Sequence, residues 1–252
     1  MVDDIAIRFS GVHKRLGPQH VLRGVDLEVR RGECLVIIGR SGCGKSVLLK
    51  HLIGLMKPDS GRIEVDGQDV VPLREMDLVP IRKKVGIVFQ GGALFDSLTV
   101  EANLAFPLLE ERSFSKAEIT ERVEDALDAV GMLGHQKKMP GELSGGMRKR
   151  VAFARAIIRK PEVVLYNEPT TGLDPIMSDS IDRLIVKMRE RFGVTSVVVT
   201  HDMHSAYSIA HRIAMLHEGK IYVVDAVDGI RKSKDPVINN FVNGISADVP
   251  DL

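Results

Sequence analysis

The sequence has few of the features that mark secreted, zinc-binding or membrane-spanning proteins. Its 252 residues include two cysteines, Cys34 and Cys43, which offer neither C-x-x-C spacing nor a disulfide framework. No window of about 18 residues is free of charge, so no membrane span is expected. Residues 1–4 show no basic region followed by an apolar run, so no secretory signal is expected. These absences favour a reducing cytoplasm and argue against structural zinc.

The chain also has no excess of charge of either sign. Lysine and arginine number 35, against 34 aspartate and glutamate residues. A balance this even gives no electrostatic reason to expect a nucleic-acid partner. One basic run falls on a predicted helix whose other face is apolar, so we expect the run to be a solvated helix face. It consists of Arg148, Lys149, Arg150, Arg155, Arg159 and Lys160.

The strongest local motif is a phosphate-binding loop. Two glycines five residues apart are followed by Lys and Ser, between a predicted buried strand (34–38) and a predicted helix (47–53). Backbone N–H groups of such a loop surround a phosphate chain at a helix N-terminus. The lysine reaches the β- and γ-phosphates, and the serine hydroxyl ligates Mg²⁺. The sequence therefore predicts a nucleoside triphosphate site with Mg²⁺. Its residues are Gly39, Arg40, Ser41, Gly42, Cys43, Gly44, Lys45 and Ser46.

The remaining pattern predicts an α/β protein in which an antiparallel start leads into a mostly parallel sheet. Residues 5–9 and 21–29 alternate as strands, and 163–166 and 196–199 are apolar throughout, as in central parallel strands. Further strands are predicted at 62–65, 85–89, 213–216 and 221–224. Helices are predicted after Thr99, from a capping box at Ser115–Glu118, over 148–159, from Asp174 to about 191, and over 237–242.

The helical segments interrupt the strands, which predicts a subdivision of the chain. Residues 91–159 are predicted to form a helical subdomain. Residues 1–90 and 160–234 are predicted to form the core, and 235–252 a C-terminal extension whose end is mobile. No internal repeat is present, so one nucleotide domain is expected.

Further motifs follow the phosphate loop in a fixed order. A loop of this kind alone is compatible with kinases, GTPases and helicases. Here it is followed by Gln90 at a strand end, by an LSGG sequence at 143–146, by an apolar run closed by Glu168, by GLDP at 172–175, and by His201. This order resembles the ATPase domain of ABC proteins, over roughly residues 5–224. The resemblance implies a P-loop ABC ATPase core with an antiparallel β subdomain, plus a helical subdomain.

The resemblance also implies a role for each motif in binding and hydrolysing ATP with Mg²⁺. Gln90 would contact Mg²⁺ and the attacking water, Glu168 would act as general base, and His201 would hold the γ-phosphate. The signature residues Ser144, Gly145 and Gly146 would contact the ATP of a second protomer. Two copies would therefore pair head-to-tail, with Asp174 crossing the interface.

Two positions depart from the family pattern. Asn167 stands where the family has an aspartate that attracts the hydration shell of Mg²⁺. Because hydrogen bonds to charged groups contribute about 1.5–3 kcal/mol, we expect a loss of about that order in Mg–ATP binding or transition-state stabilisation. Leu16 stands where the family has an aromatic ring that stacks on adenine, an interaction of about 1–3 kcal/mol.

A closer resemblance is to the Mla/Ttg-type (MlaF-like) phospholipid transporter ATPases. It rests on residues 89–100, 103–107, 174–177 and 241–245 and on the LSGGM form of the signature. Residues 91–107 are the most diagnostic, because this segment faces the permease in that family. The resemblance implies a cytoplasmic ATPase, peripheral on the cytoplasmic face of the bacterial inner membrane, in a system that maintains the lipid asymmetry of the outer membrane. Its expected partners are MlaE-like integral membrane permease subunits, an MCE-type lipid-binding protein and a small soluble regulatory subunit.

Two alternatives to a lipid transporter remain open. One is an ABC ATPase outside transport, of the iron–sulfur assembly type. The other is an ATP switch that hydrolyses slowly because of Asn167. We also hypothesise that the apolar segment after Asp235 packs on the neighbouring protomer.

Overall fold

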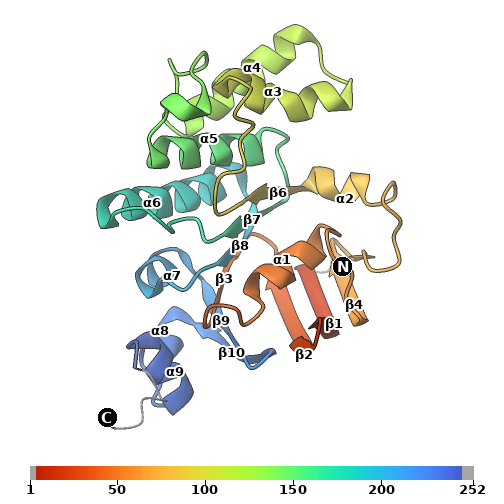
Figure 1. The fold of residues 1–252 in the computed structure, drawn as a ribbon, viewed down its shortest axis with the longest axis vertical. Coiled ribbons are helices and arrows are strands. Elements are labelled where there is room, and N and C mark those ends of the chain that lie inside the picture. Colours follow the sequence, from red (N-terminus) through yellow and green to blue (C-terminus); the bar gives the residue numbers. More distant parts are fainter. Residues whose placement is uncertain (1–3, 246–252) are drawn as a thin grey trace. The chain divides into compact units, whose positions relative to one another are not determined.

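The computed structural model describes residues 4–245 and divides the chain into two compact units. Unit 1 consists of Met1–Leu78 together with Val197–Leu252, and unit 2 is the continuous segment Val79–Ser196. In Figure 1 the colours follow the sequence, so that unit 2 runs from yellow to teal, and the two segments of unit 1 are red to orange and blue. The predicted helical subdomain, 91–159, lies within unit 2, and its boundaries stay a prediction.

Unit 1 contains a four-stranded antiparallel sheet, as the alternating apolar residues near the start of the chain predict. Its first strand extends beyond the predicted residues 5–9, and its register with the second strand shifts between Phe9 and Val12. At this bulge Gly11 has a φ of 56° and its N–H donates to the Asp26 carboxylate at 2.8 Å. The alternation changes phase there, so the pattern hides the rest of the strand. The strands, in spatial order, are β2 (Gln19–Arg30), β1 (Ile5–Leu16), β4 (Ser60–Val65) and β5 (Gln68–Asp69).

A second set of strands in unit 1 surrounds the strand that leads into the phosphate loop. β3 (Cys34–Ile38) is buried at every position and pairs in parallel with β9 (Arg212–His217). β9 continues through Glu218-Gly219, both at positive φ, into the antiparallel edge strand β10 (Lys220–Ala226). On its other side β3 neighbours β8 (Thr195–Val199), whose last three residues belong to unit 1. The predicted central strands and edge hairpin are thus confirmed.

Four helices are described in unit 1. α1 (Lys45–Leu52) follows the phosphate loop, and α9 (Pro236–Val242) lies near the C-terminus, both where the sequence predicts them. The predicted tail beyond residue 245 lies outside the described residues. α7 (Met203–Ile209) and α8 (Val227–Arg231) were not predicted, because each spans only two turns or fewer and shows little periodicity.

Unit 2 combines two parallel strands with a set of helices. β6 (Val85–Val88) and β7 (Val163–Asn167) pair with Val88 opposite Tyr166. The predicted caps are present: Thr99, Ser115 and Asp174 each accept a hydrogen bond from a backbone N–H of the helix they precede. The helices are α2 (Val79–Lys84), α3 (Val100–Glu111), α4 (Lys116–Ala129), α5 (Gly145–Ile157) and α6 (Pro175–Phe192), with a short 3-10 helix at Pro140–Glu142.

The basic run, which starts on α5 and continues past its end to Lys160, is for the most part not a solvated face; the prediction holds for the exposed Arg148 and Lys160 and was wrong for the rest. Lys149 is 6% exposed, and the arginines of the run donate to backbone carbonyl oxygens inside unit 2. Arg150 donates to Val130, Arg155 to Gly92 and Arg159 to Pro107. Gly92 and Val130 are buried and lie outside the helices and strands, so their carbonyls need donors, and long cationic side chains supply them.

Candidate nucleotide site

The phosphate loop leaves β3 in a conformation that only glycine adopts easily. Gly39 has a φ of 153°, and a Cβ atom there would clash with the backbone carbonyl oxygen of Leu216 in β9. Gly44, at φ 110°, is the N-cap of α1, and a Cβ there would lie 2.8 Å from Cγ1 of Val21. The two glycines of the motif thus let the loop pass close to β9 and β2.

The loop is suited to a polyphosphate. Among the described residues no side chain caps α1, so its N-terminal end with its positive dipole is left for an anion. A Cβ on Gly42, at φ 78°, would meet open space. Lys45 is 6% exposed, and its ammonium donates to the carbonyl oxygens of Gly39 at 2.7 Å and Arg40 at 3.1 Å. The residues present therefore fit a bound Mg–triphosphate, with a cation already held inside the loop.

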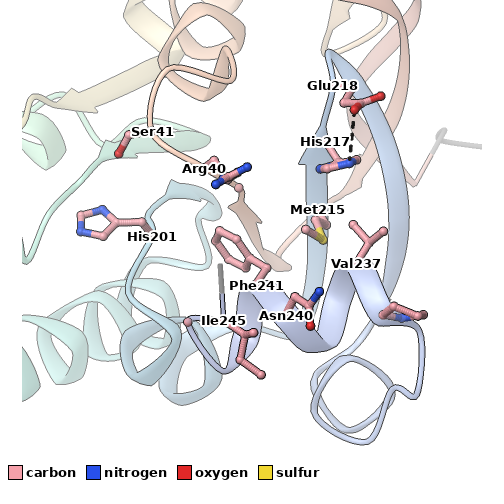
Figure 2. A pocket seen from close by; sticks show the side chains of 13 residues that line it. Arg40, Ser41, His201, Met215, His217, Glu218, Val237, Asn240, Phe241 and Ile245 are labelled. Atoms are coloured by element: carbon pink, nitrogen blue, oxygen red, sulfur yellow. Dashed lines mark ion pairs between the residues drawn. The ribbon is translucent and has the colours of Figure 1, made fainter. Parts of the chain in front are cut away.

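His201 lies beside this loop within unit 1. It follows β8, which is fixed to β3 by the Thr200 N–H donating to the Ile37 carbonyl at 3.2 Å. After it, Asp202 caps α7 by accepting from the N–H groups of His204 and Ser205. His201 lines one cavity of about 640 Å³ with Gly39, Arg40 and Ser41, and Figure 2 shows its ring near the loop. The structure therefore brings the predicted histidine to the phosphate loop.

The far wall of this cavity is α9, which sequence reasoning did not connect with the site. Val237, Asn240 and Phe241 line it, with the Phe241 ring between the helix and Arg40 in Figure 2. Ile238 is 5% exposed and anchors the helix in its own chain. A single chain does not test packing on a neighbouring protomer, so that hypothesis stays a prediction.

Gln90 and Glu168 lie at matching places at the ends of two adjacent strands of unit 2. Val88 in β6 pairs with Tyr166 in β7, so Gln90 and Glu168 each lie two residues beyond a paired position. The carboxyl ends of parallel strands meet at one edge of a sheet, which is where α/β proteins place their ligands. Asn167 is the last residue of β7 and is half-buried.

Glu168 is held in an unusual backbone conformation. Its φ is 51°, in the left-handed region, which costs a non-glycine residue on the order of 1–3 kcal/mol. Its carboxylate accepts from the Thr171 hydroxyl at 3.2 Å, and its carbonyl accepts from the Thr171 N–H at 3.4 Å. Strain of this kind, maintained by local hydrogen bonds, is typical of functional positions.

Lys149 is a site residue that sequence reasoning missed. Its ammonium donates to the carbonyl oxygens of Gln90 at 2.5 Å and Glu168 at 3.4 Å. Burial lowers the pKa of Lys149, and the charge of Glu168 opposes this shift. The sequence contained one signal of its burial: Gly146, Lys149 and Phe153 recur at helical spacing on the buried stripe of α5.

The signature and the Asp174 segment also come together in unit 2. Ser144 caps α5 by accepting from the Met147 N–H at 3.3 Å, and Asp174 caps α6 by accepting from the Met177 N–H at 2.9 Å. A Cβ on Gly146 would collide with Cε of Met177. Ser144, Gly145 and Asp174 remain exposed at this end of the two helices. Two helix N-termini thus lie side by side on the surface.

The family model described as ABC transporter matches residues 22–171, which include the phosphate loop, Gln90, the signature and Glu168. The chain belongs to the ABC transporter family. As an ABC transporter ATP-binding subunit it binds ATP with Mg²⁺, and ATP hydrolysis coupled to transport is expected of it. The predicted fold class, an ABC ATPase core with parallel and antiparallel strands, is confirmed.

Named relatives and a solved structure resemble this ABC protein over most of its length. It is 38% identical to a probable ribonucleotide transport ATP-binding protein of Mycobacterium leprae, covering 95% of this chain and 69% of the relative. It is 39% identical to the chloroplast protein TRIGALACTOSYLDIACYLGLYCEROL 3 of Arabidopsis thaliana, covering 96% and 74%. A dimeric ATP-binding cassette in a post-hydrolysis state with ADP and Pi aligns with a TM-score of 0.80 and 32% identity, covering 88% and 98%.

The part of this ABC protein that the structure describes, residues 4–245, includes no helix of the length and apolarity needed to cross a membrane.

Proposed function

We propose that the chain is the ATPase of a bacterial inner-membrane transporter for phospholipids, of the Mla/Ttg type. Two copies pair head-to-tail on the cytoplasmic face of the membrane and drive MlaE-like permease subunits that work with an MCE-type lipid-binding protein. The resemblance of residues 89–107 to that group supports this proposal. So does similarity to a plant protein whose name refers to a galactolipid.

The observation that carries the proposal is an exposed aromatic surface on those same residues. Phe95 and Phe106 are 46% and 41% exposed, with ring centroids 5.1 Å apart, and Leu109 is 57% exposed. Grouped apolar side chains on a surface indicate a contact with another protein. The surface is rigid, because the fully buried Asn103 accepts from the Phe95 N–H at 2.8 Å and donates to the carbonyls of Phe95 and Leu98 at 3.0 Å. We assign it to the permease.

Each site residue then has a chemical task in hydrolysis. Mg²⁺, when bound with ATP, neutralises phosphate charge and orients the γ-phosphoryl group. The loop glycines, Lys45 and the Ser46 hydroxyl hold the phosphates and the metal. The Glu168 carboxylate accepts a proton from the attacking water, and the His201 imidazole donates to the γ-phosphate.

The residues assigned to the second protomer's ATP lie at the helix N-termini of unit 2. Ser144, Gly145 and Gly146 present backbone N–H groups and a hydroxyl to that nucleotide. Asp174 lies beside them at the start of α6. Each complete ATP site would then consist of the phosphate loop of one copy and the signature residues of the other, so it would exist only in the dimer.

Asn167 is the feature that favours a second candidate, a slowly hydrolysing ATP switch. An amide oxygen can accept from a metal-bound water but brings no negative charge to the Mg²⁺ site. We therefore expect turnover to be slower than with an aspartate at this position, by up to about 100-fold if the loss is near 3 kcal/mol.

The test is Mg-dependent ATP turnover by the chain, alone and in the complex that a tagged copy retrieves from bacterial membranes. The Asn167→Asp variant should be faster than the original chain, and Glu168→Gln should abolish turnover in both backgrounds. Lipid-stimulated turnover and co-purification of integral membrane subunits support the transporter. Retrieval of soluble subunits only would favour an iron–sulfur assembly type of ATPase. Absence of turnover in the membrane complex, with turnover restored by Asn167→Asp, would favour the switch.

A further inference from the structure

Lys149 joins three parts of unit 2 that the proposed function uses separately. It lies in the second turn of α5, the helix whose N-terminus carries the signature residue Ser144. Its ammonium contacts the carbonyl oxygens of Gln90 and Glu168, at the ends of β6 and β7. We propose that Lys149 is a positioning residue that makes the signature helix, the Gln90 loop and the Glu168 backbone move together.

The contacts at the two carbonyl oxygens have different consequences. The contact to the Gln90 carbonyl, 2.5 Å, is the shorter of the two, and its donor is a charged ammonium. It fixes the second residue beyond β6, where the chain turns back with the Gly92 N–H donating to the Phe89 carbonyl at 2.8 Å. The longer contact reaches the carbonyl of Glu168, the residue whose φ is positive. Lys149 thus stabilises a strained peptide at the proposed general base.

The neighbouring cation Arg150 contacts other helices instead of the strand ends. Arg150 donates to the Val130 carbonyl at 2.8 Å and to the Ser180 hydroxyl at 2.6 Å, which joins α5 to α4 and α6. Lys149 is more deeply buried, and its ammonium contacts the strand-end segments named above. A buried ammonium whose acceptors are two backbone carbonyls resists separation, because each acceptor would lose a charged donor in a site with little water.

This inference rests on the roles proposed for Gln90 and Glu168, and it predicts a change in kcat rather than in ATP affinity. The phosphate loop belongs to unit 1, whereas Lys149 and both its acceptors belong to unit 2. Loss of the ammonium would let the Gln90 and Glu168 backbones shift independently, and a misplacement of about 1 Å can cost on the order of 100-fold in rate. We expect Lys149→Met to lower kcat by at least about tenfold while the Kd for Mg–ATP stays within about threefold.

The experiment compares Lys149→Met, Lys149→Arg and the control Arg150→Met by ATP turnover, fluorescent-nucleotide binding, thermal unfolding and amide hydrogen exchange. Lys149→Met should raise exchange together at Gly92 and Thr171, whose N–H groups donate to Phe89 and Glu168. Lys149→Arg, which keeps a cation, should restore most of the protection and part of kcat. Arg150→Met should lower the unfolding temperature without raising exchange at those two amides.

The outcomes separate this proposal from the proposed function. If Lys149→Met keeps kcat and shows no coupled rise in exchange, Lys149 is not a positioning residue. The same conclusion follows if Arg150→Met raises exchange at Gly92 and Thr171 as much as Lys149→Met does. If Lys149→Met does not fold, an unchanged kcat in Lys149→Arg overturns the proposal as well. If no chain turns over ATP but exchange rises at both amides in Lys149→Met, the link stands and the assigned hydrolytic function fails.

Discussion

Gly39 in the phosphate loop and Leu216 in β9 approach so closely that no side chain fits between them. A Cβ on Gly39 would collide with the carbonyl oxygen of Leu216, and the φ of 153° at Gly39 is itself unfavourable for other residues. The phosphate loop is therefore seated against the backbone of β9, not merely against side chains that could move aside.

Gly39→Ala is expected to destabilise the protein strongly. Because the obstacle is a backbone atom in a central strand, relief requires movement of the loop or of β9, and we expect a cost of at least about 2–3 kcal/mol. The matched control is Gly146→Ala, where the obstacle is the terminal methyl group of Met177, which can rotate away. Its cost should be below about 1 kcal/mol. Denaturant unfolding measures both, and equal costs would contradict the argument.

Alkylation of Cys43 is expected to report occupancy of the phosphate loop. Burial raises the pKa of its thiol, and this outweighs the opposing effect of the Lys45 ammonium. The thiol therefore stays protonated at neutral pH, so alkylation by iodoacetamide should be slow at pH 7. Its rate should rise with a midpoint above the ordinary thiol value of about 8.5. Mg–ATP should protect Cys43 by covering the loop.

The control for this labelling is Cys43→Ser, which should abolish it, because Cys34 is fully buried in β3. Mass spectrometry of the alkylated peptides distinguishes the two thiols. Rapid alkylation of Cys43 at pH 7 would contradict the expected pKa direction. Labelling unaffected by saturating Mg–ATP would contradict the assignment of the loop as the phosphate site.

Asn103 is expected to be essential for the aromatic surface assigned to the permease. Asn103→Leu keeps roughly the volume but removes the donor that holds the Phe95, Leu98 and Thr99 carbonyls. Leaving these buried groups without their donor should cost about 2–4 kcal/mol, with binding of the membrane subunits lost. Phe95→Ser should lose the same binding at little cost in stability, because the ring is 46% exposed. If the Phe95→Ser variant retrieved the membrane subunits at normal yield, the assignment of this surface to the permease would be wrong.

Asp235 is expected to control the attachment of α9. It accepts from the N–H groups of Val237 at 2.9 Å and Ile238 at 3.2 Å and from the Tyr222 hydroxyl at 2.8 Å. The Tyr222 hydroxyl lowers the pKa of Asp235, so the carboxylate stays charged at neutral pH, and its contribution is lost only as the pH falls through that lowered pKa. At pH 7, Asp235→Ala should speed proteolysis within residues 236–245 more than Tyr222→Phe does.

The control for α9 is Asp228→Ala, which removes an exposed ion pair with Lys232 on α8 and should leave proteolysis unchanged. Removal of the chain after Asp235 addresses the hypothesis that this segment packs on the neighbouring protomer. Unchanged dimerisation and complex assembly of that truncated chain would contradict the hypothesis.

Local chemistry allowed several elements of the fold to be predicted. The strand β3, the caps at Thr99, Ser115 and Asp174, and the turn at Glu218-Gly219 depend on residues close in sequence, so pattern alone located them. The second half of β1 was missed, because a bulge at Gly11 resets the alternation. The short helices α7 and α8 were missed because a helix of seven or five residues is too short to show a helical pattern of apolar residues.

By itself the sequence determined which chemistry this protein carries. The order of phosphate loop, Gln90, signature, Glu168 and His201 is a property of residue types and spacing, and each type has a fixed capacity to hold phosphate, metal or a proton. Asn167, and the question it raises about Mg²⁺, is likewise visible in the sequence.

Only the tertiary structure decided where the buried charges and apolar helices act. Lys149 belongs to a basic run that looks solvated, yet its ammonium lies between two strand ends that are far from it in sequence. In the sequence α9 is an ordinary apolar segment, whereas in the structure it lines a cavity together with Arg40 and His201. Both outcomes depend on contacts between distant residues, since the free energy of burying a charge or a ring is set by its surroundings in space.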